Sequence, residues 1–145
     1  MTPWSADTQK DIMETGPNQG NEGLQRRLSL LLVDDEKGYA EVLAKRLALR
    51  DIVVTVALSG TEAIQILRGR QVDAAVLDLK LEDMDGIEVL RIFKKMDPLM
   101  PVIMVTGHGS ETAARQGIEY GAFDYLMKPC GINLLIEKIR EACKG

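Results

Sequence analysis

Short apolar runs alternate with helical patterns along the chain from Ser29 onward. The runs cover residues 29–33, 52–58, 73–79, 101–106 and 123–128, and their length and apolar content are typical of β-strands. After each run, apolar residues recur at helical spacing, within residues 39–47, 63–67, 87–93, 114–118 and 132–143. The pattern therefore predicts five strands, each followed by a helix.

Strict alternation of strands and helices predicts an α/β fold, with a parallel sheet covered by helices on both faces. The first, third and fourth strands are the most continuously apolar, as central strands should be. The second and fifth are more mixed, which is typical of edge strands. These features favour a flavodoxin-like, doubly wound five-stranded sheet of order 2-1-3-4-5 over a barrel, which needs eight such units.

The N-terminal segment, residues 1–27, has a different composition. It is rich in Gly, Asn, Gln, Thr and charged residues and has no sustained period, so we expect a disordered tail. Residues 28–145 are expected to form one domain. Because no further element follows the helical pattern at residues 132–143, we expect a single-domain protein whose output depends on a partner.

Composition excludes several classes of partner. The formal net charge is −4, and there is no Lys/Arg run or helix-turn-helix pattern, so no direct nucleic-acid contact is expected. No apolar run approaches the roughly 20 residues of a membrane span, so no membrane insertion is expected. The N-terminus has no secretory pattern, and the two cysteines, Cys130 and Cys143, are not spaced as metal ligands. A cytoplasmic location is predicted.

Polar side chains of complementary types end four of the five predicted strands. Ligands of an open α/β sheet bind beyond the carboxyl ends of the strands, where the strand order reverses. We therefore expect these side chains to meet at one rim of the sheet. They are Asp34, Asp35 and Glu36, which follow the first strand, and Asp78, Thr106 and Lys128, which end the third, fourth and fifth strands.

The residue types at this rim point to phosphoryl transfer. Converging carboxylates without Cys or His suit a hard cation, of which Mg²⁺ is the best match. An Asp carboxylate can itself attack phosphorus and form an aspartyl phosphate. Thr106 can donate a hydrogen bond to a phosphoryl oxygen, and Lys128 can pair with the phosphoryl charge. The acids therefore predict a Mg²⁺-dependent phosphoryl-transfer site.

Four stretches resemble the receiver domain of two-component response regulators: "LLLVDDE", "AAVLDLKLEDMDG", "PVIMVTGHGS" and "GAFDYLMKP". The resemblance covers residues 29–144. It implies that Asp78 is the phosphoacceptor and that a histidine kinase or a histidine phosphotransfer protein is the donor. It implies a signalling module that assists its own phosphorylation and dephosphorylation rather than an enzyme. The implied Mg²⁺ ligands are Asp34, Asp35, Asp78 and the backbone carbonyl of Lys80, and the implied switch and phosphate-binding residues are Thr106, Lys128 and Tyr125.

The resemblance also implies finer features. The Lys128–Pro129 peptide should be cis, Lys80 and His108 should tune the lifetime of the phosphate, and the face formed by the fourth helix, fifth strand and fifth helix should switch. This chain departs from the family at two positions. Glu82 stands where Pro is common, and Cys130 stands where an aromatic residue is common. These departures bear on the rigidity of the loop after Asp78 and on packing at the start of the last helix.

Other functions remain open at this stage. A degenerate receiver could bind its partner without phosphorylation. A Mg²⁺-dependent phosphatase of the haloacid-dehalogenase type needs a second Asp two residues after the nucleophile, where this chain has Lys80. A flavin carrier of the same sheet order needs a phosphate-binding loop after the first strand, where the acids Asp34, Asp35 and Glu36 would repel phosphate.

Overall fold

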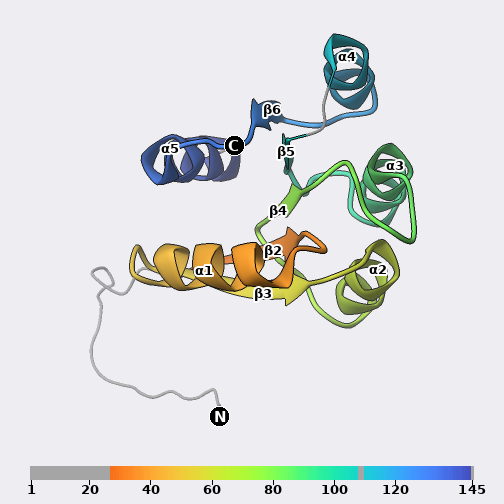
Figure 1. Cartoon of the computed structure of the whole chain (residues 1–145). Helices are drawn as coiled ribbons and strands as arrows, with labels where there is room; N and C mark the ends of the chain where they lie inside the picture. The colour runs from red at the N-terminus through yellow and green to blue at the C-terminus, as the bar shows by residue number, and fades with distance from the viewer. Residues whose placement is uncertain (1–26, 108–109, 145) are drawn as a thin grey trace.

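The protein is a three-layered α/β structure with a parallel sheet as its middle layer (Figure 1). The computed structural model describes residues 27–107 and 110–144; the predicted tail up to residue 26, and His108, lie outside these residues. The strands are β2 (Leu28–Val33), β3 (Ile52–Ala57), β4 (Ala74–Leu77), β5 (Val102–Thr106) and β6 (Asp124–Met127). The helices are α1 (Lys37–Ala48), α2 (Gly60–Gly69), α3 (Gly86–Met96), α4 (Glu111–Glu119) and α5 (Ile132–Cys143).

The strands of the sheet lie in the order β3-β2-β4-β5-β6, and all neighbouring pairs are parallel. In chain order these are the second, first, third, fourth and fifth strands, so the predicted flavodoxin-like order 2-1-3-4-5 is confirmed. The edge strands β3 and β6 are only partly buried, whereas every residue of β4 and β5 is buried. The strand order reverses between β2 and β4, where a ligand site is expected.

Alternate residues of the central strands point into two separate cores, one on each face of the sheet. In β2, Leu31 and Val33 belong to the core that includes residues of α2 and α3. Leu30 and Leu32 belong to the core that includes residues of α1 and α5. Figure 1 shows α1 and α5 on one side of the sheet and α2, α3 and α4 on the other. The predicted coverage of both faces is confirmed.

Side-chain caps explain where several helices begin. The Ser59 hydroxyl accepts from the Glu62 N–H at 3.0 Å, and Asp85 and Ser110 cap α3 and α4 in the same way. Ser59 and Glu62 form a variant of the capping box. The Glu62 carboxylate accepts from the Leu58 N–H, one residue before the cap. Among the described helices, none combines the length and the apolar character that crossing a bilayer requires.

Gly86, the first residue of α3, packs directly on the backbone of the loop that follows Asp78. A Cβ at this position would lie 2.5 Å from the Leu79 carbonyl oxygen. Main chain cannot move aside as a flexible side chain can. Gly86→Ala is therefore expected to lower the free energy of unfolding by about 2–3 kcal/mol, measured by urea denaturation.

Gly38, in α1, provides the matched control. A Cβ there would meet nothing within 4 Å. Because Ala has the higher helix propensity, Gly38→Ala should raise the free energy of unfolding by about 0.5–1 kcal/mol. A Gly86→Ala protein as stable as the wild type would contradict the close contact with Leu79.

Candidate functional site

Four strand ends meet at the rim where the strand order reverses. The structure brings the sequence-predicted site residues together here, because parallel strands present their carboxyl ends at the same edge. Asp34 and Asp35 follow β2, Asp78 follows β4, Thr106 ends β5 and Lys128 follows β6.

Backbone hydrogen bonds hold two of these residues just beyond the regular strands. The Asp78 N–H donates to the Val33 carbonyl at 3.0 Å, and the Lys128 N–H donates to the Thr106 carbonyl at 3.0 Å. Each bond continues the hydrogen bonding between neighbouring strands by one residue, and so fixes the backbone of Asp78 and of Lys128. The positions of the Asp78 carboxylate and the Lys128 ammonium are therefore set by rigid elements rather than by free loops.

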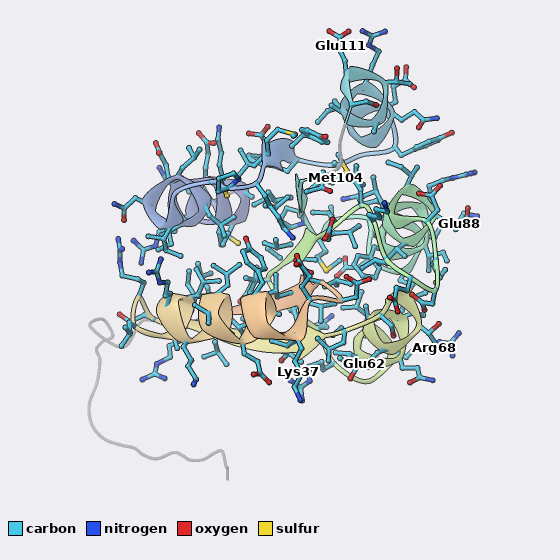
Figure 2. The ribbon with its side chains drawn as sticks, viewed as in Figure 1. Lys37, Glu62, Arg68, Glu88, Met104 and Glu111 are labelled. Atoms are coloured by element: carbon cyan, nitrogen blue, oxygen red, sulfur yellow. The ribbon has the colours of Figure 1, made fainter. Side chains whose placement is uncertain are left out.

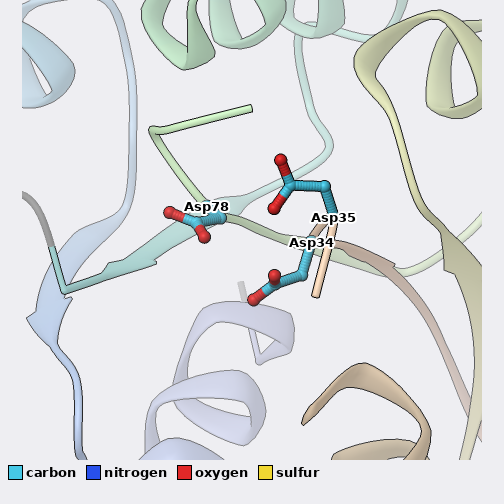
Figure 3. Close-up of side chains that lie close together, drawn as sticks. All are labelled: Asp34, Asp35 and Asp78. Carbon is cyan, nitrogen blue, oxygen red and sulfur yellow. The ribbon is translucent and has the colours of Figure 1, made fainter. Parts of the chain in front are cut away.

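The carboxylates of Asp34, Asp35 and Asp78 converge at this rim, as Figure 3 shows. One oxygen from each lies within 4.8 Å of the other two. Asp34 is 2% exposed and Asp78 is 5% exposed, while Asp35 is half-buried. Little water reaches the two buried carboxylates to screen their repulsion, so the cluster needs positive charge close by.

Lys128 provides that positive charge within the described chain. Its Nζ lies 2.7 Å from Asp34 Oδ2 and 3.2 Å from Asp78 Oδ2, both close enough for charge-assisted hydrogen bonds. Glu36 Oε1 lies 3.4 Å from the same nitrogen, but its side chain is 68% exposed. The ammonium is therefore shared mainly between the two buried carboxylates.

Burial and charge shift the proton affinities of this pair. Burial raises the pKa of Asp34, and the hydrogen bond from Lys128 offsets only part of that effect. Burial alone would lower the pKa of Lys128. The hydrogen bond to Asp34 and the negative charges of Asp34 and Asp78 outweigh this effect and raise the pKa above its ordinary value. Lys128 is thus firmly held as a cation, and one ammonium faces three carboxylates.

The loop between β4 and α3 is attached to the acid cluster at two points. The Lys80 N–H donates to Asp78 Oδ1 at 3.2 Å, and the Glu82 N–H donates to Asp35 Oδ2 at 3.1 Å. A proline has no N–H and could not make the second bond. Because residue 82 is Glu and not Pro, Asp35 has a backbone hydrogen-bond partner, and this bond attaches the loop to the acid cluster.

Asp83 fastens the same loop to the start of α2. Its carboxylate accepts from the Gly60 N–H, the Thr61 N–H and the Thr61 hydroxyl at 3.0, 3.0 and 2.7 Å. These hydrogen bonds, with the Thr61 hydroxyl first, lower the pKa of Asp83. The sequence contains no indication of the contacts that Asp83 and the Glu82 N–H make. The contact between Thr61 and Asp83 spans 22 positions and that between Asp35 and Glu82 spans 47, and contacts at such separations leave no local pattern.

The remaining predicted residues lie around the rim. Thr106 is fully buried at the end of β5. Tyr125, in β6, packs against the core that includes residues of α2 and α3. Its Oη is buried and makes no hydrogen bond within the described part of the chain, and burial raises its pKa. The Lys128–Pro129 peptide is cis. Cys130 is half-buried and packs against the core formed with α1 and α5.

The donor set fits a hard divalent cation. Mg²⁺ binds oxygen at about 2.0–2.1 Å, so two of its ligands lie roughly 3–4 Å apart. Small side-chain adjustments would bring the oxygens of Asp34, Asp35 and Asp78 to that spacing from the 4.8 Å within which they already lie. Among the described residues this group contains carboxylates alone, which matches Mg²⁺ or Ca²⁺ rather than a softer metal.

A comparison with protein families finds a match over residues 30–140 to the response regulator receiver domain. Among curated proteins, the chain is 38% identical over 120 residues to a putative NtrX-like response regulator of Rickettsia felis. That alignment covers 81% of this chain and 25% of the relative, so the chain spans about a quarter of the length of that protein.

Solved structures give the same fold. A CheY-like response regulator receiver domain from Methanospirillum hungatei superposes with a TM-score of 0.78 at 32% identity, covering 81% of this chain and 94% of that one. A response regulator from Burkholderia pseudomallei, solved with a phosphorylated aspartic acid, calcium ion and citrate, has a TM-score of 0.74 at 25% identity. That match covers 77% of this chain and 66% of the other.

Removal of the Lys128 charge tests the electrostatic description of the site. Lys128→Met leaves the buried carboxylates of Asp34 and Asp78 without their cation, and such losses are typically strongly destabilising. We expect the free energy of unfolding to fall by about 3 kcal/mol in EDTA, measured by urea denaturation.

Lys138→Met is the matched control. Lys138 pairs with Asp124 at 3.0 Å, and both side chains are more exposed to screening water than those of Lys128 and Asp34. Its loss should change stability far less than the loss of Lys128. Equal effects of the two substitutions would show that the acid cluster does not depend on Lys128.

Proposed function

The chain belongs to the response regulator receiver domain family, and we propose that its Asp78 accepts a phosphoryl group in a Mg²⁺-dependent reaction. Receiver domains are signalling modules of two-component systems, controlled by phosphorylation. The donor in this proposal is a histidine kinase or a histidine phosphotransfer protein. The observation that carries it is the convergence of Asp34, Asp35 and Asp78 on one rim beside the Lys128 ammonium.

The chain's own residues would divide the work of transfer. An Asp78 carboxylate oxygen attacks phosphorus, the bond from phosphorus to the donor histidine breaks, and the histidine leaves. Lys128 pairs with the charge on the phosphoryl oxygens, and the Thr106 hydroxyl donates a hydrogen bond to one of them. Bound Mg²⁺, held by Asp34, Asp35, Asp78 and the Lys80 carbonyl, would supply the positive charge that offsets repulsion between carboxylate and phosphoryl group. The same groups would assist hydrolysis of the aspartyl phosphate.

The proposed switch runs from Thr106 to the face formed by α4, β6 and α5. Thr106 moves toward the phosphoryl group, and the Tyr125 ring follows into the space that it leaves. The buried Oη of Tyr125 has no hydrogen-bond partner among the described residues, so movement of its ring would break no hydrogen bond of the hydroxyl there. Large apolar side chains are partly exposed on or beside these elements, as a protein-binding face requires: Ile118, Tyr120, Phe123, Met127 and Leu134.

We place this activity in the cytoplasm, with a protein as the output partner. The formal net charge of −4 disfavours direct contact of this chain with nucleic acid. The Burkholderia pseudomallei neighbour, which was solved with a phosphorylated aspartic acid and a calcium ion, supports an aspartyl phosphate together with a divalent cation on this fold.

Intact-mass spectrometry after incubation with acetyl phosphate and Mg²⁺ tests the proposal. We expect one phosphoryl adduct on the wild-type chain, none in EDTA, and none on Asp78→Asn, since the amide cannot act as the nucleophile. Asp85→Asn is the matched control: Asp85 caps α3 and lies outside the acid cluster, so the adduct should persist. A folded wild type without an adduct at any time point would favour a receiver that binds its partner without phosphorylation.

Lys80 is proposed to tune the lifetime of the phosphate. Its side chain is exposed, two residues beyond Asp78, and can pair with the phosphoryl group and shield it from water. His108, the second proposed tuning residue, lies outside the described residues. We expect Lys80→Ala to change the half-life of the phosphorylated protein severalfold, measured by loss of the adduct after removal of donor. Lys95→Ala, on α3, is the control, and equal half-lives for Lys80→Ala and the wild type would contradict this role.

A further inference from the structure

Tyr39 places an aromatic ring against the Lys128 ammonium. The residue lies in the first turn of α1, and Lys128 Nζ lies 4.3 Å from the centre of its ring. An ammonium at this distance is attracted by the negative face of the ring. In the sequence, Tyr39 belongs only to the pattern of helical spacing within residues 39–47.

Two of the other partners of the ammonium are groups that the proposed reaction engages. Asp34 and Asp78 lie 2.7 and 3.2 Å from Lys128 Nζ, and both are proposed ligands of the metal. Asp78 also loses its carboxylate charge when it becomes an acyl phosphate. Glu36 remains, but its side chain is 68% exposed and its charge is screened by water. The Tyr39 ring has no charge to neutralise and is not a metal ligand, so its attraction for the ammonium persists through the reaction.

The ring is partly enclosed by its surroundings. Tyr39 is half-buried and packs against the core formed with α1 and α5, beside a groove lined by Val42, Leu43, Cys130 and Ile132. It also helps to shield the ammonium from solvent, since the Lys128 side chain is only 14% exposed. A ring fixed on a helix by packing can direct the ammonium at little entropic cost.

We propose that Tyr39 is a positioning residue for phosphoryl transfer. Its ring keeps the Lys128 ammonium at the acid cluster while Asp34 and Asp78 exchange their contacts with it for contacts to the metal and the phosphoryl group. This role rests on the proposed function of Asp78, but the contact between Tyr39 and Lys128 can be tested without it.

Two variants of the full chain separate the effect of the ring from that of the hydroxyl. Tyr39→Phe keeps the ring and loses the hydroxyl, whereas Tyr39→Leu loses the ring. In metal-free, unphosphorylated protein, the ring should shift the NMR signals of the Lys128 ε-CH₂ protons upfield. The shift should persist in Tyr39→Phe and vanish in Tyr39→Leu. Phosphorylation by acetyl phosphate in Mg²⁺ should slow by roughly three- to thirtyfold in Tyr39→Leu and stay within about twofold of wild type in Tyr39→Phe.

A double-mutant cycle distinguishes positioning from simple packing. In a Lys128→Met background there is no ammonium to position, so Tyr39→Leu should slow the residual phosphorylation no further. The same fold loss in both backgrounds, or a wild-type rate for Tyr39→Leu, would overturn the proposal. An unchanged Lys128 signal in Tyr39→Leu would overturn the contact itself. If the wild type takes up no phosphoryl group, the function of Asp78 fails, and the NMR comparison still decides whether the ring contacts Lys128.

Discussion

Buried negative charge at one rim of the sheet is the constraint on which the rest of the site depends. Asp34 and Asp78 are almost completely buried and lie beside Asp35, and within the described chain one ammonium, that of Lys128, bonds to both buried carboxylates. One positive charge cannot neutralise three carboxylates in a partly desolvated pocket. The cluster is therefore stabilised by whatever brings further positive charge, which a divalent cation does.

The parallel sheet makes this arrangement possible and links it to the surface. Strands β2 and β4 carry the acids, while β5 and β6 carry Thr106 and Lys128. Strand β6 is also an edge strand with partly exposed side chains, flanked by α4 and α5. In the proposed switch, a change in charge at Asp78 would reach the face formed by α4, β6 and α5 through two neighbouring strands. Figure 2 shows the side chains that fill the space between the sheet and the helices on either side of it.

Much of this was predictable from the sequence because strands leave strong local signals. Alternation of apolar runs and helical periods predicted the strand order, and the polar residues at the ends of the runs predicted Asp34, Asp78, Thr106 and Lys128 as neighbours. Contacts made by tertiary packing could not be predicted in the same way. The Glu82 N–H reaches Asp35 from a loop, Asp83 bonds to the start of α2, and the Tyr39 ring contacts Lys128. Each of these contacts joins positions whose spacing follows no helical or strand period.

The most direct test of the charge balance at this rim is the free energy of unfolding as a function of Mg²⁺ concentration, measured by urea denaturation against an EDTA baseline. If the acid cluster binds the cation in the folded state, stability should rise by about 1.4 kcal/mol for each tenfold increase in Mg²⁺ above the dissociation constant. The rise should be strongly reduced in Asp35→Asn, which removes one carboxylate without breaking the pairs of Lys128 with Asp34 and Asp78. Stability that does not change with Mg²⁺, or that rises equally in Asp35→Asn, would contradict the central claim that this cluster is built to hold a divalent cation.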